Sequence, residues 1–516
     1  MDQNETAVVI GAGIGGLAAA IRLAAMGLAV TVVESADSPG GKARAIASPA
    51  GPVDTGPTVL TMRSEFDALF DLAGQSLDDH IRLIPQPILA RHWWQGSPTL
   101  DLHPEREANI EAIHAFAGPR EAAAFARFDH LAQSLLTAFD GPVMRAARPN
   151  LAQIARTAAV QPRLWPALLP GMSLERLLKL HFRDPRLIQL FGRYATYVGG
   201  RPRHAPGVLA LIWRAEVQGV WAVEGGMHSL AAALARLATG MGVRFCYATS
   251  ARRILTNNGR VSAVETEGGH RLPCHTCVFN GDPAALTEGL LGPEARNAVP
   301  KAKTTPRSLS AHVWAFAATP QGADLAHHNV FFTDDPNAEF GPIGRGLPPD
   351  KPTLYLCAQD RTPSAPQGPE RFEIILNAPP FAEPTQDEEP RCRHRTFPRL
   401  KDFGLTFAPD PAPSALTTPA HLARLYPASQ GAIYGRSPEG MLAAFQRPTA
   451  QTRLPGLVLA GGGAHPGAGV PMAALSARHA EGAIRQDRIS ASMSAPTAMP
   501  GGISTGSATT ARAPSR

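Results

Sequence analysis

The stretch Ala7-Val8-Val9-Ile10-Gly11-Ala12-Gly13-Ile14-Gly15-Gly16 decides the fold of the first part of the chain. Its first four residues form a continuous apolar run, which is typical of a strand buried on both faces of a parallel sheet. Ile14–Met26 is rich in alanine and leucine and indicates a helix, and Gly27 stands where a helix C-cap is needed. Ala29–Val33 is a second buried strand. The pattern predicts strand, tight turn, helix and strand, the unit that binds a dinucleotide.

The glycines have the G-x-G-x-x-G spacing, in which each glycine has a mechanical reason. Gly11 permits a tight turn, Gly13, beside Gly15, lets the backbone approach a pyrophosphate, and Gly16 allows close packing of helix on strand. The helix start offers free N–H groups to the phosphates. Glu34 ends the second strand, where a carboxylate accepts hydrogen bonds from both ribose hydroxyls. The alternative is a glycine-rich turn without a ligand.

A second glycine pair distinguishes FAD from NAD. Gly40-Gly41-Lys42-Ala43-Arg44 follows Glu34 closely. In a flavin-type pocket, a glycine pair with a basic residue lets the backbone run close past the cofactor. The sequence holds no second strand, G-x-G-x-x-G and helix unit, because Gly344-Arg345-Gly346 lies among prolines. We therefore predict one FAD and no nicotinamide domain.

Composition excludes several classes of protein. The 516 residues are 44% hydrophobic, which is too many for general disorder, and five cysteines are too few for a disulfide scaffold. The formal charge of +6 comes without any run of lysine and arginine, so we predict no nucleic-acid partner. The acidic start Met1–Glu5 is unlike a secretory signal, and Leu454–Ala477 contains glycines and prolines that argue against a membrane helix. We expect a cytoplasmic protein.

Shifts in pattern along the chain predict the domain organisation. Residues 1–104, 216–300 and 451–487 have the strand and helix character of the dinucleotide-binding domain, and residues 105–215 are helical. Residues 301–450 mix strands with proline-rich loops and form a second domain with a mixed sheet. Residues 488–516 have no apolar period, so we predict a disordered tail there.

Two segments resemble the bacterial-type carotenoid and phytoene desaturases. Asp54-Thr55-Gly56-Pro57-Thr58-Val59-Leu60-Thr61 looks like the segment that follows the FAD motif in that family. Gly456–Val470, with Gly461-Gly462-Gly463-Ala464-His465-Pro466-Gly467, is similar to the family's carboxyl-terminal signature. The branch that the chain resembles most is the 1-hydroxycarotenoid 3,4-desaturases, through four further segments: Ala90–Trp94, Val223–His228, Gly431–Pro438 and Pro471-Met472-Ala473.

This resemblance implies an α/β fold like that of the flavin amine oxidases. A Rossmann-type FAD-binding domain would be interleaved with an α+β substrate domain and with a helical part that contacts a membrane. Gly11, Gly13, Gly15, Gly16 and Glu34 would hold the ADP half of FAD, and Gly41 and Lys42 would lie along the pyrophosphate or ribityl chain. By the same resemblance, the strand around Ile254 would cover adenine, and Gly463, Val470 and Met472 would meet the ribityl chain and flavin ring.

The reaction that the resemblance implies is FAD-dependent desaturation of the C3–C4 bond of an acyclic 1-hydroxycarotenoid. It needs a hydride taken from an allylic carbon and a proton lost from its neighbour, and flavin can accept the hydride. The polyene spreads the developing cation, so we assign no catalytic base. His92, His228 and His465 stand in motif segments, but we expect structural roles for them. Trp93, Trp94, Trp213, Trp221 and Trp314 either line a polyene tunnel or fill the core.

Partners follow from the same chemistry. A membrane quinone or dioxygen would accept the electrons, and a carotenoid substrate requires access to a bilayer. Leu164–Met172 and Leu174–Phe182 combine leucine, tryptophan and phenylalanine with Arg163, Arg176 and Lys179, so they lie in a membrane interface or pack on the protein's own core. We predict a peripheral protein of the inner, intracytoplasmic membrane and no metal, since Cys274-His275-Thr276-Cys277 has no partner pair at zinc spacing.

Three other functions remain open from the sequence. A phytoene desaturase repeats the reaction several times, and a carotenoid isomerase uses reduced flavin without net oxidation. A prenyl-binding protein like the GDP-dissociation inhibitors shares the architecture without FAD, although Glu34 and the glycine motif argue against it.

Overall fold

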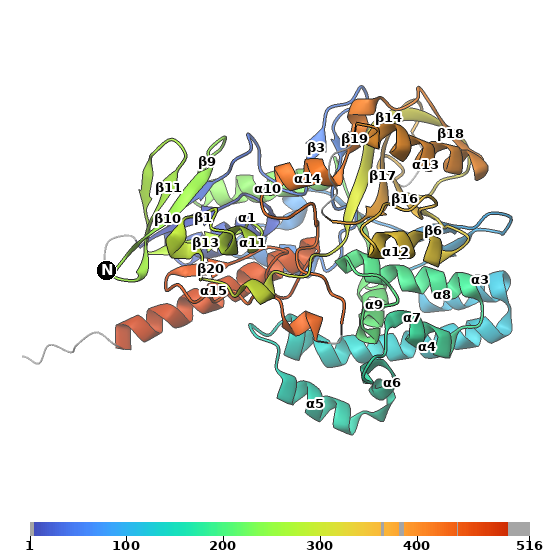
Figure 1. Cartoon of the computed structure of the whole chain (residues 1–516), viewed down its shortest axis with the longest axis horizontal. Coiled ribbons are helices and arrows are strands. Elements are labelled where there is room, and N and C mark those ends of the chain that lie inside the picture. The colour runs from blue at the N-terminus through green and yellow to red at the C-terminus, as the bar shows by residue number, and fades with distance from the viewer. Residues whose placement is uncertain (1–4, 363–365, 381–385, 441, 494–516) are drawn as a thin grey trace, which may run out of the picture.

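The computed structural model describes residues 5–362, 366–380, 386–440 and 442–493. The nucleotide-binding part is built on a five-stranded parallel sheet (Figure 1, left). Its spatial order is β20 (Leu457–Leu459), β13 (Thr276–Phe279), β1 (Thr6–Ile10), β2 (Ala29–Val33) and β9 (Arg244–Cys246). The order shows that three distant parts of the chain build one sheet.

Helices cover one face of this sheet and a small antiparallel sheet covers the other. Three helices share one apolar core with alternate residues of β1 and β2: α1 (Ile14–Ala25), α10 (Met227–Gly240) and α15 (Val470–Met493). The other residues of β1 and β2 pack on the sheet of β10 (Ala251–Asn257), β11 (Arg260–Thr266) and β12 (Arg271–Pro273). Both faces are buried, which explains the continuous apolar runs of the strands.

A second, mixed sheet of eight strands forms the upper right of the molecule (Figure 1). Its order is β18 (Leu405–Ala408), β14 (Ser310–Gly322), β17 (Glu370–Ala378), β16 (Leu354–Ala358), β15 (His328–Phe331), β6 (Ala90–Trp93) and β7 (Leu100–Leu102), with β19 (Leu416–Thr417) paired to β14. The helix α13 (Glu388–Asp402) packs on one face of this sheet, in an apolar core that contains Trp314, Phe372 and Leu400.

The pairing of β6 with β15 corrects one predicted boundary. We place residues 1–104 in the nucleotide-binding domain from the sequence, but β6 and β7 belong to the mixed sheet. The predicted tail also begins too early, because α15 continues to Met493, and residues 494–516 lie outside the described part. Pairing partners and helix ends depend on distant segments, which a local pattern does not reveal.

The helical part lies below the mixed sheet (Figure 1). It contains α3 (Arg106–Ala117), α4 (Pro119–Phe139), α5 (Leu151–Val160), α6 (Trp165–Leu168), α7 (Leu174–His181), α8 (Pro185–Gly192) and α9 (Leu211–Val217). The shorter elements are α2 (Ser64–Asp71), α11 (Ala284–Thr287), α12 (Pro336–Gly344), α14 (Pro419–Leu425), β3 (Ala45–Ile46), β4 (Val53–Asp54), β5 (Leu83–Pro85) and β8 (Trp221–Val223). Within the described residues, every helix is too short or too polar to cross a membrane.

Candidate nucleotide and substrate site

The glycine-rich turn lies at the carboxyl end of β1, in contact with two other loops. Gly11 has a φ of +99°, a conformation that favours glycine. A Cβ atom on Gly15 would lie 2.6 Å from the Cα of Gly461, so helix α1 and the carboxyl-terminal glycine loop pack backbone to backbone. The N–H of Gly40 donates to the carbonyl of Ala12 over 2.9 Å. The two glycine pairs and the carboxyl-terminal loop that the sequence singles out therefore meet at one place.

Glu34 is buried at the end of β2 and points at the same turn. Its Oε2 accepts a hydrogen bond from the N–H of Ala12 over 2.6 Å, and its Oε1 accepts one from the N–H of Ala36 over 2.8 Å. Each carboxylate oxygen can accept more than one hydrogen bond. The carboxylate is thus held beside the turn with capacity left for ribose hydroxyls.

Three cations gather near the turn: Arg307 and Arg447 are buried, and Lys42 is half-buried. Lys42 donates to the carbonyl of Ile433 over 2.6 Å, and burial lowers the pKa of Lys42 to about 8. Burial also lowers the pKa of Arg447 to about 10, and Arg307 forms a buried ion pair with Asp282. The carboxylate of Asp282 opposes the effect of burial on both Lys42 and Arg447. Three cations that share one carboxylate leave positive charge in the interior.

These features fit a pyrophosphate. No side chain caps the start of α1 and its first turn has no acidic residue, so N–H groups and the positive end of the helix dipole face the turn. A dianionic pyrophosphate would compensate the buried positive charge of Lys42, Arg307 and Arg447. Gly11, Gly13, Gly16, Glu34, Gly41 and Lys42 would hold it with the ribose, as we predict from the sequence.

Residues that the sequence analysis missed complete this site. The side chain of Asn280 donates to the carbonyl of Gly11 over 3.2 Å and touches the positions of a Cβ on Gly13, Gly15 and Gly461. Asn280 and Asp282 directly follow β13, the strand next to β1. Since parallel strands end at the same edge, polar residues after an apolar strand were a usable signal. Arg307 and Arg447 offered no such signal.

The segment predicted to meet the flavin ring lies against the motif around Tyr434. A Cβ on Gly435 would lie 3.3 Å from the Cα of Gly463, and a Cβ on Gly463 would lie 2.5 Å from Cδ of Pro283. Val470 is buried at the start of α15 and Met472, two residues further, is half-buried. Their contacts with ribityl chain and flavin ring stay a prediction.

Ile254 lies deeper than the sequence suggests. Its side chain is fully buried in the core between the parallel sheet and β10–β12, and its N–H donates to the carbonyl of Leu291 over 3.0 Å. Thr249, at the start of the same segment, donates its N–H to the carbonyl of Glu34 over 2.8 Å. The segment therefore passes beside the backbone of Glu34, and the contact of Ile254 with adenine stays a prediction.

The histidines of the motif segments have structural partners. His228 Nδ1 lies 3.0 Å from the carbonyl of Ala43, and the N–H of His228 donates to Asp54 at the start of α10. His465 Nε2 lies 2.9 Å from the carbonyl of Ala146, and burial lowers the pKa of His465 to about 4. A carbonyl accepts, so both nitrogens donate, and these two imidazoles position loops.

The cysteine pair is part of the core. Cys274 and Cys277 are buried free thiols, and burial raises the pKa of Cys274 to about 12. One other group of metal-ligating side chains occurs in the described ranges: His327, His328 and Cys357, with ligand atoms within 4.8 Å of one another. His328 Nδ1 lies 2.7 Å from the hydroxyl of Tyr355 and His327 Nε2 lies 3.6 Å from the sulfur of Cys357, so these atoms already have partners.

A cavity of about 530 Å³ opens between the helical part and the mixed sheet. Trp94, Arg193 and Phe332 line it, together with Lys179 and Glu175 of α7. Of the tryptophans proposed for a tunnel, Trp94 lines this cavity, whereas Trp213 fills the helical core and Trp314 fills the core under α13.

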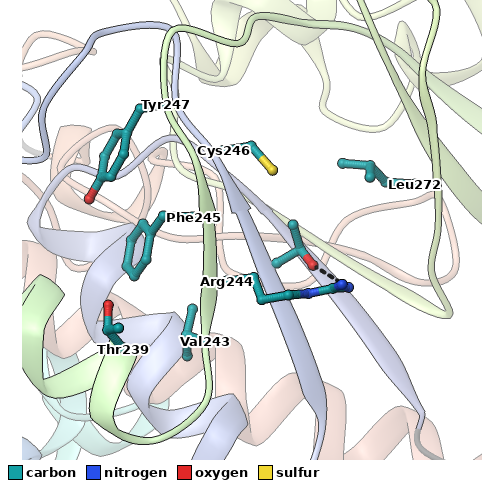
Figure 2. A pocket seen from close by; sticks show the side chains of 8 residues that line it. Thr239, Val243, Arg244, Phe245, Cys246, Tyr247 and Leu272 are labelled. Atoms are coloured by element: carbon teal, nitrogen blue, oxygen red, sulfur yellow. Dashed lines mark hydrogen bonds between the residues drawn. The ribbon is translucent and has the colours of Figure 1, made fainter.

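A hollow of similar size lies on the far edge of the nucleotide-binding sheet (Figure 2). Figure 2 shows the side chains of Arg244, Phe245 and Cys246 on β9. The guanidinium of Arg244 donates a hydrogen bond to the hydroxyl of Thr31 over 3.3 Å. Among the described residues, the buried polar atoms that lack a partner all lie outside this lining. It offers less for ligand recognition than the cavity at Arg193.

Known proteins share this architecture and sequence. The family model of flavin-containing amine oxidoreductases matches residues 14–314. The chain is 61% identical to a hydroxyneurosporene desaturase of Rhodobacter capsulatus, over 95% of this chain and 100% of the relative. It is 60% identical to a hydroxyneurosporene desaturase of Cereibacter sphaeroides, over 94% of this chain and 98% of the relative. The structure of cyclohexylamine oxidase from Brevibacterium oxydans matches with a TM-score of 0.55 at 16% identity, over 95% of this chain and 100% of that one.

Proposed function

The chain belongs to the flavin-containing amine oxidoreductases, and from this membership we propose that it is an FAD-dependent carotenoid desaturase that forms the C3–C4 double bond of acyclic 1-hydroxycarotenoids. The identity of 61% with a hydroxyneurosporene desaturase over the whole relative carries the proposal. It favours this reaction over phytoene desaturation and isomerisation, and it favours an enzyme over a prenyl-binding protein.

FAD supplies the two-electron acceptor when bound. The chain's own residues would bind and position FAD. Glu34 and the start of α1 would hold the ADP half, and Lys42 would compensate the pyrophosphate charge. The apolar part of the cavity, with Trp94 and Phe332, excludes water from the substrate. The polyene stabilises positive charge that develops during hydride loss, so the reaction requires no charged residue at that carbon.

Membrane contact is part of the proposal. In α5, α6 and α7 and the loops between them, Trp165, Leu169 and Leu180 are 53%, 51% and 66% exposed, while Leu174, Leu177, Leu178 and Phe182 are buried. The segment therefore packs on its own core with one side and leaves a second apolar side exposed. Arg163, Arg176 and Lys179 of the same segment are exposed, and α5 and α6 form the lower edge of the molecule (Figure 1).

This apolar and basic surface lies beside the cavity, because Glu175 and Lys179 of α7 line it. A peripheral protein with this surface on the inner, intracytoplasmic membrane would receive a carotenoid without passing it through water. Electrons would leave to a membrane quinone or to dioxygen.

The vesicle test compares the triple change Trp165→Ser, Leu169→Ser, Leu180→Ser with Leu290→Ser, a leucine that is 47% exposed in the nucleotide-binding part. We expect the triple variant to lose binding to anionic vesicles in a flotation assay and Leu290→Ser to keep it. Equal binding by both variants would exclude this surface as the membrane contact.

The functional test is anaerobic incubation of the protein with FAD, a quinone and 1-hydroxyneurosporene in liposomes, followed by polyene absorption and product analysis. We expect a red shift from one added conjugated double bond. Turnover of phytoene at the same rate would identify a general desaturase, and a change of geometry alone would identify an isomerase. Turnover that requires air would identify dioxygen as the acceptor.

A further inference from the structure

Two buried side chains at this cavity have polar atoms without hydrogen-bond partners in the described structure, although Arg193 also lies over the ring of Tyr197, 5.0 Å from its centroid, and near the carboxylate of Glu216. Arg193 is 9% exposed and lines the cavity, and its Nε and Nη2 have no hydrogen-bond partner among the described residues. His92 is fully buried behind the cavity, and its Nε2 also has no partner there. A buried polar group without a partner costs free energy, so such a group in a native protein requires an explanation.

The protonation of His92 follows from its contacts. Its Nδ1 lies 3.0 Å from the carbonyl of Leu100, and since a carbonyl only accepts, Nδ1 carries the proton. Burial, with the nearby charge of Arg193, lowers the pKa of His92 well below its ordinary value. The imidazole is therefore neutral, and Nε2 presents a lone pair that can accept a hydrogen bond.

Arg193 thus offers N–H donors and His92 offers an acceptor. The guanidinium is close enough to lower the pKa of both His92 and His328, yet no direct hydrogen bond joins it to either imidazole in the described structure. A hydroxyl group is at once an acceptor and a donor. One hydroxyl between Arg193 and His92 would satisfy both.

One wall beside this pair is aromatic, whereas charged side chains such as Arg186, Arg201 and Glu339 line other parts of the cavity. The rings of Trp94 and Phe332, which line the cavity, stack with centroids 4.8 Å apart, and Phe332 stacks on His92 with centroids 5.9 Å apart. The aromatic wall fits an apolar chain end that carries a hydroxyl.

The pair is also connected to the nucleotide side of the molecule. Arg193 begins the 3₁₀ turn Arg193–Val198, and the next residue, Gly199, packs against Tyr434, beside Gly435 and Gly463. His328 lies on β15, the strand that pairs with the strand of His92. Its Nδ1 lies 2.7 Å from the hydroxyl of Tyr355, and this hydroxyl donates to Thr58 over 2.7 Å.

We propose that Arg193 and His92 bind the tertiary hydroxyl of the 1-hydroxycarotenoid and make the enzyme specific for it. An N–H of Arg193 donates to the hydroxyl oxygen, and the hydroxyl proton is donated to Nε2 of His92. This inference rests on the proposed function. Carbon C1 is separated from C3 by C2 alone, so a bound hydroxyl also fixes where the C3–C4 bond lies.

Specificity follows because a polar site rejects a ligand that leaves it unpaired. A site built to hydrogen-bond a substrate hydroxyl discriminates far more strongly than an apolar pocket that only tolerates it. Neurosporene, which lacks the hydroxyl, would leave Arg193 and His92 buried and unpaired.

The test measures the ratio of kcat/KM for 1-hydroxyneurosporene to that for neurosporene in liposomes. We expect Arg193→Met to lower this ratio by about 10- to 150-fold and His92→Phe by about tenfold, the range for hydrogen bonds to charged and neutral groups. His92→Gln, which keeps an acceptor, and Arg193→Lys, which keeps charge, should retain part of the ratio. Asn337→Ala, an exposed residue at the rim of the cavity, is the matched control and should leave the ratio unchanged.

A folding defect lowers both rates together, so the ratio separates recognition from stability. If Arg193→Met and His92→Phe lower both rates equally, the pair binds a structural water and the proposal is wrong. If wild-type protein desaturates both substrates equally, the hydroxyl inference fails and the desaturase function stands. If it desaturates neither while FAD is bound, the proposed function itself fails.

Discussion

The two faces of the mixed sheet differ although the same strands build them. The face under α13 carries Trp314, Phe331, Leu356, Phe372 and Ile374, all buried in one apolar core. On the opposite face, Cys357 pairs with His328 and Glu373, and Val330 pairs with His92 and Tyr355. Residues that pair directly share a face. One face holds the sheet together, and the other presents buried polar groups towards the cavity and the nucleotide-binding part.

Neighbours in β17 show the contrast most directly. Phe372 points into the apolar core, and Glu373 points to the polar face, where both of its carboxyl oxygens lack a hydrogen-bond partner in the described structure. Burial raises the pKa of Glu373 well above its ordinary value, and the nearby Asp54 raises it further. Alternate residues of a single strand thus lie in the apolar core and among buried polar groups.

The largest expected effect is on the apolar face. Phe372→Ala removes a fully buried ring that packs on Phe316 and Phe407, and we expect it to lower the free energy of unfolding by about 3–5 kcal/mol. Denaturant unfolding with FAD present measures the change. A loss below about 1 kcal/mol would contradict the structural role of this face.

Glu373, the neighbour of Phe372, should make the free energy of unfolding depend on pH. Above pH 4.5 the carboxyl group of Glu373 stays protonated in the folded state, whereas it loses its proton in the unfolded state. The folded protein therefore binds more protons than the unfolded protein. For this reason the free energy of unfolding falls as pH rises towards the raised pKa. Glu373→Gln should remove this decline, which amounts to at most about 1.4 kcal/mol per pH unit for one group. Unfolding curves from pH 5 to pH 8 compare the two proteins, and parallel pH dependences would show that Glu373 titrates normally.

The smallest expected effect is at Tyr355. Tyr355→Phe keeps the ring and removes the hydroxyl between His328 and Thr58, so we expect a loss of about 1 kcal/mol in stability. Turnover of 1-hydroxyneurosporene should fall by a larger factor than stability alone explains, because the polar face loses its connection to residues 54–58. Thermal unfolding and steady-state turnover of the same preparation test this, and unchanged turnover would separate Tyr355 from the substrate site.

Much of the nucleotide site could be predicted from the sequence because its constraints are local. The glycines, the helix start and Glu34 lie within one β–α–β unit, and the Gly40–Gly41 pair follows within the same segment. Asn280 and Asp282 were within reach of the same reasoning, since they directly follow the apolar strand β13. Arg307 and Arg447 were not, because they come from loops whose proximity depends on how the two sheets pack.

The domain boundary at residue 104 failed for a related reason. The strands β6 and β7 carry short mixed patterns that suit either sheet, and their partner β15 lies more than two hundred residues away in the sequence. A strand's partner is set by which neighbour covers its faces, and that is a property of the packed molecule.

The sequence by itself determined the dinucleotide-binding unit, since the apolar runs, the glycine conformations and the helix start constrain one another over a few residues. It also indicated the family through its motif segments. The tertiary structure alone decided which polar groups are buried without partners. Alternation of residues along a strand indicates that the two faces of the strand differ. Whether a histidine or an arginine contacts water, a hydrogen-bond partner or a cavity depends on segments that folding brings together from across the chain. The unpartnered polar atoms of Arg193 and His92 are therefore visible only after folding, because the surroundings of each side chain come from several parts of the chain.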